Sequence, residues 1–205
     1  MKTLFQARLA DLKDRMCERE IDTALVTDDD NIFYLTGYYD YLHMDFGRPT
    51  IFVVHQHGPS LLITPQIDKN SARSLAYCDE ISGWNDGMGD EWREKLPNII
   101  KLSKKIGIEA DRIPQIVLSY LSSLNSKEKF VNFSEILEEM RMIKSPEELQ
   151  VARHAGQVAN AMMKAGREAI IDGRPEFEVA IATSAAGTRS AAELLEKQYP
   201  STEMS

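Results

Sequence analysis

The first 140 residues of the chain alternate between two hydrophobic patterns. Apolar residues spaced three to five apart, with charges between them, predict an amphipathic helix over residues 3–19. Short apolar runs bounded by turn residues predict strands at 24–26, 50–55 and 60–64. The segment between the first two strands, which begins with the acidic sequence DDDN, is predicted to form a turn and a loop.

The same alternation continues to about residue 140. Helical patterns and short strand patterns follow one another, with helices within 64–77, 91–102 and 114–124, strands within 104–114 and 130–133, and a loop rich in Gly, Asp and Asn at 83–90. Pro114 begins the third of these helices, and Ser134 is a partial cap for a helix after the last strand. Helices and strands that alternate at this length predict an α/β domain over residues 1–140.

The pattern changes in residues 141–205. Ser145 and Pro146, followed by two glutamates, form a sound helix start, and a stripe rich in alanine and methionine runs from there to Ile171. A second helix is predicted from Phe177 onward. Residues 1–140 carry 16 basic and 23 acidic side chains, a net charge of −7, whereas the remainder carries 8 and 9, a net of −1, which supports a boundary near residue 141.

Two consecutive helices with apolar stripes cannot close a hydrophobic core without a further layer to pack against. Their apolar faces, predicted at Val151, Val158, Met162, Val179 and Ile181, therefore need cover, and self-association is one way to provide it.

Composition narrows the class of protein. Apolar residues make up 43% and charged residues 27% of the chain, as in soluble globular proteins, and no apolar run approaches the ~20 residues that span a bilayer. The net charge of −8 argues against a nucleic-acid partner, because phosphate binding needs a basic surface. Cys17 and Cys78 do not make a disulfide scaffold and are expected to be buried, reduced thiols. The charged, amphipathic start does not resemble a signal peptide, so a cytoplasmic location is expected.

A complete active site is not apparent in the sequence. His55 and His57 lie two residues apart at a predicted strand end, where they could share a face, but no third metal ligand is nearby, so a polar strand terminus is the simpler interpretation. There is no His-Glu-x-x-His motif, Cys-x-x-Cys pair, nucleophile elbow or Gly-rich phosphate loop. The acidic run at 28–31 lacks the ligand spacing of a calcium loop. No metal or other cofactor is therefore expected within this chain.

The stretch NIFYLTGYYDYLHMDFGRPTIFVV, residues 31–54, concentrates aromatic residues beside one arginine. Phe33, Tyr34 and Leu35 are predicted to belong to the hydrophobic core.

The second half of this stretch has a functional interpretation. Tyr41, His43, Phe46 and Arg48 would sit at a loop tip and contact a ligand, because arginine offers a planar fork to a carboxylate and an aromatic ring can stack beside it. A local ion pair between Arg48 and Asp45 is the competing interpretation.

Five phrases, NIFYLTGYYDY, DFGRPTIFVV, GIEAD, MRMIKSPEELQVARHAGQVANAMMKAG and EFEVAIAT, occur in an order and spacing that resemble the creatinase, prolidase and Xaa-Pro aminopeptidase family. The likeness covers nearly the whole chain but only the first half of such a protein. It implies an α/β N-terminal domain with a mixed sheet flanked by helices at 1–140. Residues 141–205 would then be a linker and the first two helices of an incomplete "pita-bread" catalytic domain.

Within the family, the phrase FGR and the run EVAIAT look most like creatinase, which cleaves creatine. That resemblance implies that Phe46 and Arg48 help to hold a substrate carboxylate at a site completed by the other subunit of a homodimer. Peptidase members bind two divalent metal ions and creatinase works through a histidine, and both sets of residues belong to the half that this chain lacks. The chain is therefore expected to provide substrate-binding and dimerisation surface for hydrolysis of a C–N bond in creatine or an Xaa-Pro dipeptide, without turning over substrate alone.

Three alternatives remain open. The chain could be a non-catalytic binding or dimerisation module, since its last two helices need cover. It could come from another relative, such as an ectoine hydrolase or a dimethylsulfoniopropionate lyase. A doubly wound domain that binds a small molecule at its loop ends is the third, although no phosphate loop supports it.

Overall fold

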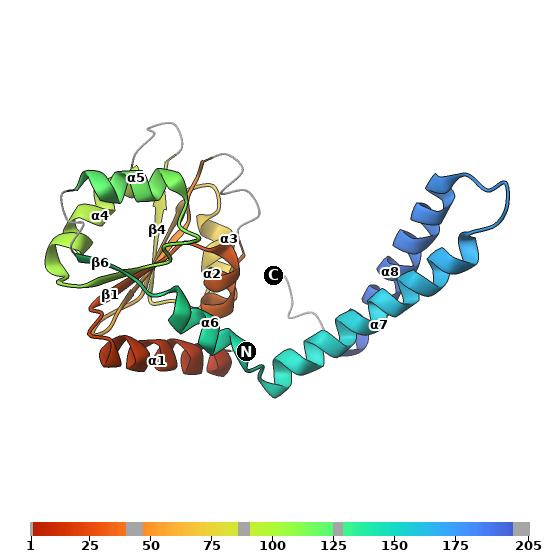
Figure 1. Cartoon of the computed structure of the whole chain (residues 1–205), viewed down its shortest axis with the longest axis horizontal. Helices are drawn as coiled ribbons and strands as arrows, with labels where there is room; N and C mark the ends of the chain where they lie inside the picture. Colours follow the sequence, from red (N-terminus) through yellow and green to blue (C-terminus); the bar gives the residue numbers. More distant parts are fainter. Residues whose placement is uncertain (1, 40–46, 86–90, 125–128, 199–205) are drawn as a thin grey trace. The chain divides into compact units, whose positions relative to one another are not determined.

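A mixed six-stranded sheet is the centre of the first of two compact units, residues 1–142 (Figure 1). The computed structural model describes residues 2–39, 47–85, 91–124 and 129–198. The strands lie in the order β4-β3-β2-β1-β5-β6; their bounds are Thr23–Val26 (β1), Ile51–His55 (β2), Leu61–Pro65 (β3), Glu80–Trp84 (β4), Ile106–Ile108 (β5) and Phe130–Asn132 (β6). β2 pairs antiparallel with both β1 and β3, and the other neighbouring strands pair in parallel, so β2 alone runs opposite to the other five strands of this sheet.

In the part of the first unit that the structure describes, six helices cover both faces of this sheet. They are α1 (Lys2–Glu18), α2 (Asp29–Thr36), α3 (Lys69–Leu75), α4 (Glu91–Leu102), α5 (Gln115–Ser123) and α6 (Ser134–Met142). Side chains alternate along β1, so Ala24 and Val26 pack with α1, α2, α3 and α6, while Leu25 packs on the opposite face with α4 and α5. Burial on both faces explains why β1 is a continuous apolar run rather than an alternating one.

The structure confirms the α/β fold with a mixed sheet flanked by helices. It contradicts the loop predicted after β1, where α2 forms instead. Asp28 is its N-cap and accepts a hydrogen bond from the backbone N–H of Asn31, and Gly37 ends it with φ of 78°. The acidic run is thus a helix start, and eight residues were too few to show a helical period.

The edge strand β4 was also missed. Its sequence, EISGW, includes a glycine and only two large apolar residues, and most of its side chains are half-buried or exposed because it pairs on one side only, with β3. An edge strand of this kind carries little hydrophobic signal.

Two further expectations about burial were wrong. Phe33 is 50% exposed, whereas Leu35 is buried and Tyr34 is half-buried. The cysteines are free thiols, but Cys17 is exposed and Cys78 is half-buried, so neither lies fully inside the core. Burial, with a smaller contribution from the charge of Asp79, raises the pKa of Cys78 to about 11, which keeps this thiol protonated.

The second unit, residues 143–205, is a helical hairpin in the part that the structure describes. It consists of α7 (Pro146–Ala169) and α8 (Glu176–Gln198), which pack along each other. The helix start predicted at Ser145 is confirmed, with Pro146 at the first helical position. The Ser145 side chain accepts a hydrogen bond from the Glu148 N–H, and Glu148 reaches back to the Ser145 N–H, which completes a capping box. The described residues contain no helix of the length and hydrophobicity needed to cross a bilayer.

Replacing Ser145 with Ala is expected to destabilise the second unit by about 1 kcal/mol, because an N–H in the first turn of α7 loses its acceptor. Native-state hydrogen exchange at α7 amides measures the change. Ser71→Ala, at an exposed position within α3, is the matched control and should leave α7 unchanged. Equal protection of α7 in the wild type and in Ser145→Ala would contradict the assigned cap.

Candidate functional site

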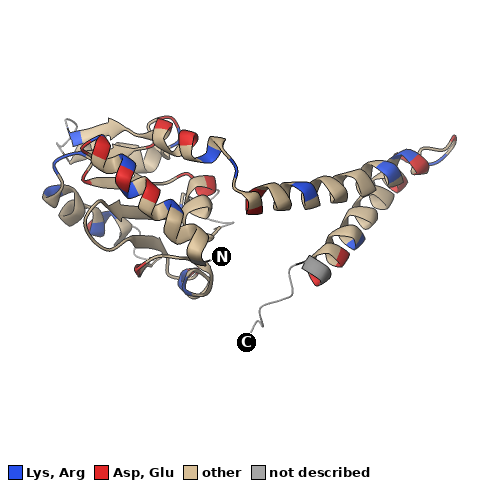
Figure 2. Cartoon of the chain, turned by 90° about the horizontal axis from the view of Figure 1, so that it is seen from below, with Lys and Arg blue, Asp and Glu red and all other residues tan. Residues whose placement is uncertain are grey.

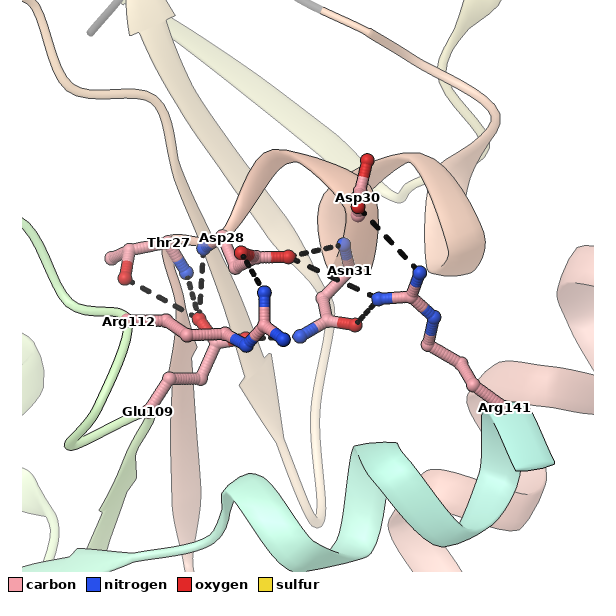
Figure 3. Close-up of polar contacts among 7 residues, drawn as sticks. All are labelled: Thr27, Asp28, Asp30, Asn31, Glu109, Arg112 and Arg141. Atoms are coloured by element: carbon pink, nitrogen blue, oxygen red, sulfur yellow. Dashed lines mark hydrogen bonds and ion pairs between the residues drawn. The ribbon is translucent and has the colours of Figure 1, made fainter.

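Three polar residues from distant parts of the chain, Asn31, Glu109 and Arg141, meet in one hydrogen-bonded network (Figure 3). Asn31 lies in the first turn of α2, Glu109 directly follows β5, and Arg141 lies in the last turn of α6. Each comes from one of the sequence phrases that carry the family resemblance: NIFYLTG, GIEAD and MRMIKS.

Glu109 is the centre of this network and is completely buried. Its Oε2 accepts hydrogen bonds from the backbone N–H groups of Thr27 and Asp28, at 2.5 and 2.9 Å, and from the Thr27 hydroxyl at 3.3 Å. Its Oε1 accepts one from Nδ2 of Asn31, at 2.6 Å. Burial raises the pKa of Glu109, while these hydrogen bonds favour the ionised form and limit the rise.

The side chain of Asn31 connects Glu109 to Arg141. Its Oδ1 accepts a hydrogen bond from Nη1 of Arg141 at 2.6 Å. Arg141 also lies 3.7 Å from the carboxylate of Asp30 and 4.0 Å from that of Asp28. Asp28 in turn accepts a hydrogen bond from Arg112 at 3.1 Å. The network thus runs from the buried carboxylate of Glu109 through the neutral amide of Asn31 to a guanidinium, and from there to surface carboxylates.

The geometry of this network suits a structural role for Glu109. Glu109 is completely buried and both of its oxygens accept hydrogen bonds from the protein, so a substrate proton does not reach this carboxylate in the structure. The network instead ties together the start of α2, the end of β5 and the end of α6. The three phrases indicate the family in the sequence, but no local pattern in them predicts that their polar residues converge.

Arg48 is the predicted substrate-binding residue that the structure describes. It is half-buried, directly after Gly47, whose φ is 66°. The backbone beside it is held in place, because Nε1 of Trp84 donates a hydrogen bond to the Pro49 carbonyl at 3.3 Å. This anchors the entry into β2. Tyr41, His43 and Phe46, predicted to share the site, lie outside the described residues.

His55 is the last residue of β2, at the polar strand end expected for it. Its Nδ1 lies 2.9 Å from Oγ1 of Thr23, which lies 2.7 Å from Oγ of Ser103. Ser103 donates to the Ile99 carbonyl, so Thr23 donates to Ser103 and His55 donates from Nδ1 to Thr23. Burial, with the charge of Lys13, lowers the pKa of His55 and favours this neutral form.

Comparison with known proteins adds the family. Residues 8–143 match the family described as the Creatinase/Prolidase N-terminal domain. Over 158 residues the chain is 27% identical to the putative dipeptidase YkvY of Bacillus subtilis, covering 76% of this chain and 43% of that protein. Over 197 residues it is 25% identical to creatinase of Bacillus sp. (strain B-0618), covering 94% and 46%. The chain thus spans less than half the length of these curated relatives.

Solved structures show the same fold. The prolidase from Pyrococcus horikoshii OT3 superposes with a TM-score of 0.74 at 18% identity, covering 89% of this chain and 48% of that one. The N-terminal domain of an X-Pro dipeptidase from Streptococcus pyogenes superposes with a TM-score of 0.56 at 20% identity, covering 65% of this chain and 98% of that one.

Proposed function

Because the chain belongs to the Creatinase/Prolidase N-terminal domain family, we propose that it forms part of the substrate site of a hydrolase. The reaction would be hydrolysis of a C–N bond in a small carboxylate-bearing molecule of the creatine or Xaa-Pro dipeptide type, as the names of two relatives suggest: creatinase, and an Xaa-Pro dipeptidase of Pyrococcus furiosus that is 23% identical over 177 residues. The family match over residues 8–143 carries this proposal. Free cysteines suit a protein that works in the reducing cytoplasm.

The catalytic groups would belong to a part of the whole protein outside these 205 residues. In a peptidase-type protein that part would hold two divalent metal ions. The residues described here do not fit such a role, since among them no group of three or more His, Cys, Asp or Glu side chains is placed to bind a metal.

Arg48 is the proposed contact for the substrate carboxylate. Its guanidinium can donate two parallel hydrogen bonds to a carboxylate, and its half-buried position excludes part of the competing water. The same site would be lined by the aromatic side chains of Phe46, Tyr41 and His43, which would stack against the ligand.

Turnover assays test whether the catalytic groups lie outside these 205 residues. The 205-residue chain is expected to release no product from creatine or from glycyl-proline, because the described residues hold no complete catalytic constellation. Robust, concentration-dependent turnover by this chain alone would overturn the proposal.

A binding experiment tests Arg48 directly. In amide NMR titrations, creatine and glycyl-proline are expected to shift the Gly47 and Arg48 signals, whereas creatinine and glycyl-prolinamide, which lack the carboxylate, should not. Arg48→Ala is expected to raise the dissociation constant of creatine and of glycyl-proline at least about tenfold, or about 1.4 kcal/mol. The reason is that the carboxylate of the bound ligand loses its positively charged partner. The dissociation constant of Arg48→Lys should lie between those of the wild type and Arg48→Ala, because lysine keeps the positive charge but lacks the planar, two-donor guanidinium group.

Arg73→Ala, at an exposed arginine of α3, is the matched control and should bind as the wild type does. If Arg48→Ala binds creatine and glycyl-proline with unchanged affinity, Arg48 does not form the carboxylate site.

A second candidate function, a non-catalytic binding or dimerisation module, is favoured by the α7–α8 hairpin. Large apolar side chains on it are more than half exposed, among them Met163, Phe177 and Ile181. Exposed apolar surface of this extent is typical of interaction sites.

A further inference from the structure

The two residues that follow Arg48 are held by side chains from other strands. Pro49 is buried, and its carbonyl accepts the hydrogen bond from Nε1 of Trp84 at 3.3 Å. Thr50 is also buried, and its hydroxyl lies 3.1 Å from the hydroxyl of Thr64 in β3. Trp84 is the last residue of β4, and β3 lies between β4 and β2, so the indole spans β3 to reach the entry into β2.

Trp84 is itself fixed in place. Only 3% of its surface is exposed, and its ring belongs to the hydrophobic cluster that includes Ile51 and Ile63. Its backbone carbonyl accepts a hydrogen bond from the N–H of Gln66 at 2.6 Å. Because the ring is packed on all sides and the backbone is held in the sheet, the indole N–H is a donor with little freedom to move.

The backbone chemistry of Pro49 restricts Arg48 as well. Proline has a fixed φ and disfavours the helical conformation for the residue before it, which here is Arg48. The hydrogen bond from Trp84 fixes the direction of the Pro49 carbonyl and so restricts the other backbone dihedral of this proline. Together these restrictions limit the direction in which the side chain of Arg48 leaves the backbone.

Charges elsewhere on the first unit do not single out this position. Figure 2 shows basic and acidic residues interspersed over the described part of the unit, so its surface is not dominated by one sign of charge. The affinity of Arg48 for a carboxylate then depends on how well the guanidinium is placed before the ligand arrives, because ordering a long side chain on binding lowers the affinity.

We propose that Trp84 is a positioning residue of the carboxylate site and acts through Arg48. Its indole N–H holds the Pro49 carbonyl, and the Pro49 backbone holds Arg48 in the orientation that presents the guanidinium to a substrate carboxylate. Trp84 itself does not touch the ligand. This role rests on the proposed function of Arg48.

Amide ¹⁵N relaxation of the whole chain tests the positioning without any ligand. The order parameter of the Arg48 amide is expected to be about 0.85 in the wild type, as in rigid backbone, and to fall toward about 0.6 in Trp84→Phe. Benzothienylalanine at position 84 has the shape of tryptophan but carries sulfur in place of the N–H. It should have the same effect without leaving a cavity.

Trp92→Phe is the matched control. Trp92 is buried in the same hydrophobic cluster as Trp84, but its indole N–H makes no hydrogen bond to any described residue. The substitution therefore removes the same atoms from the same part of the core without removing a donor. It should leave the order parameter of the Arg48 amide and the affinity for ligands as they are in the wild type.

Ligand binding tests the consequence for the site. Trp84→Phe is expected to raise the dissociation constants of creatine and glycyl-proline about fivefold, because Arg48 is then ordered only when the ligand binds. In an Arg48→Ala background, Trp84→Phe should leave these constants unchanged, since the residue through which Trp84 acts is gone.

Failure of the carboxylate site and failure of the Trp84 role give different results. If Arg48→Ala alone leaves the affinity unchanged, the carboxylate site is wrong and the role of Trp84 in it falls too. If Arg48→Ala weakens binding but Trp84→Phe does not, or if Trp84→Phe weakens it equally with and without Arg48, only the Trp84 role is wrong. An Arg48 order parameter that is the same in the wild type, Trp84→Phe and the benzothienylalanine variant would also overturn that role.

Discussion

Glu109→Gln is expected to lower the free energy of unfolding of the first unit by about 3 kcal/mol at pH 8. The amide has nearly the same shape as the carboxylate but only one accepting oxygen. If that oxygen takes the place of Oε2, it keeps the N–H groups of Thr27 and Asp28, and the new NH₂ group faces Nδ2 of Asn31. Asn31 can then satisfy the NH₂ only by flipping, which turns its own NH₂ toward Arg141.

Urea unfolding followed by circular dichroism measures this loss. Glu18→Gln, at the exposed end of α1, removes the same charge without a buried partner and should change stability by less than about 0.5 kcal/mol. A double-mutant cycle adds Arg141→Met. If the effect passes through Asn31, Arg141→Met should cost less in the Glu109→Gln background than in the wild type, with a coupling of about 1 kcal/mol. Additive effects of the two substitutions, or a loss from Glu109→Gln below about 1 kcal/mol, would show that the network is not coupled.

The architecture was predictable where burial made the pattern simple. β1, β2 and β3 are apolar runs with little interruption, and α4 begins and ends at the predicted residues, Glu91 and Leu102. α2 was not predictable from periodicity, because its short length hides the repeat and its acidic start resembles a turn. Here the N-cap hydrogen bond and the glycine at the C-terminal end decide the structure.

The site was less predictable because its contacts are remote in sequence. Asn31 and Glu109 are 78 residues apart, and Asn31 and Arg141 are 110 apart. No local pattern predicts that two such pairs share one amide group, although the motifs that contain them are recognisable. Arg48 stood out for the opposite reason: its signal, an arginine among aromatic residues, is local.

Gly37→Ala is expected to cost about 3 kcal/mol, from two separate causes. Gly37 ends α2 with φ of 78°, a conformation that costs a residue with a Cβ about 1 kcal/mol or more. A Cβ at this position would also lie 2.7 Å from Cζ of Phe5, in the ring of a partly buried side chain from α1, so the ring or the helix must shift. Because the chain leaves α2 at Gly37, eleven residues before Arg48, the same shift should move the Arg48 amide signal in NMR spectra.

Two comparisons separate these causes. Gly47 has φ of 66°, and a Cβ there would have no described atom within 4 Å, so Gly47→Ala should show the backbone cost alone, about 1 kcal/mol. In a Phe5→Ala background, Gly37→Ala should likewise fall to about 1 kcal/mol, because the ring that its Cβ meets is gone. Equal losses for Gly37→Ala with and without Phe5 would assign the whole effect to backbone strain. The close approach of Phe5 in α1 to the end of α2 would then have no part in the loss of stability.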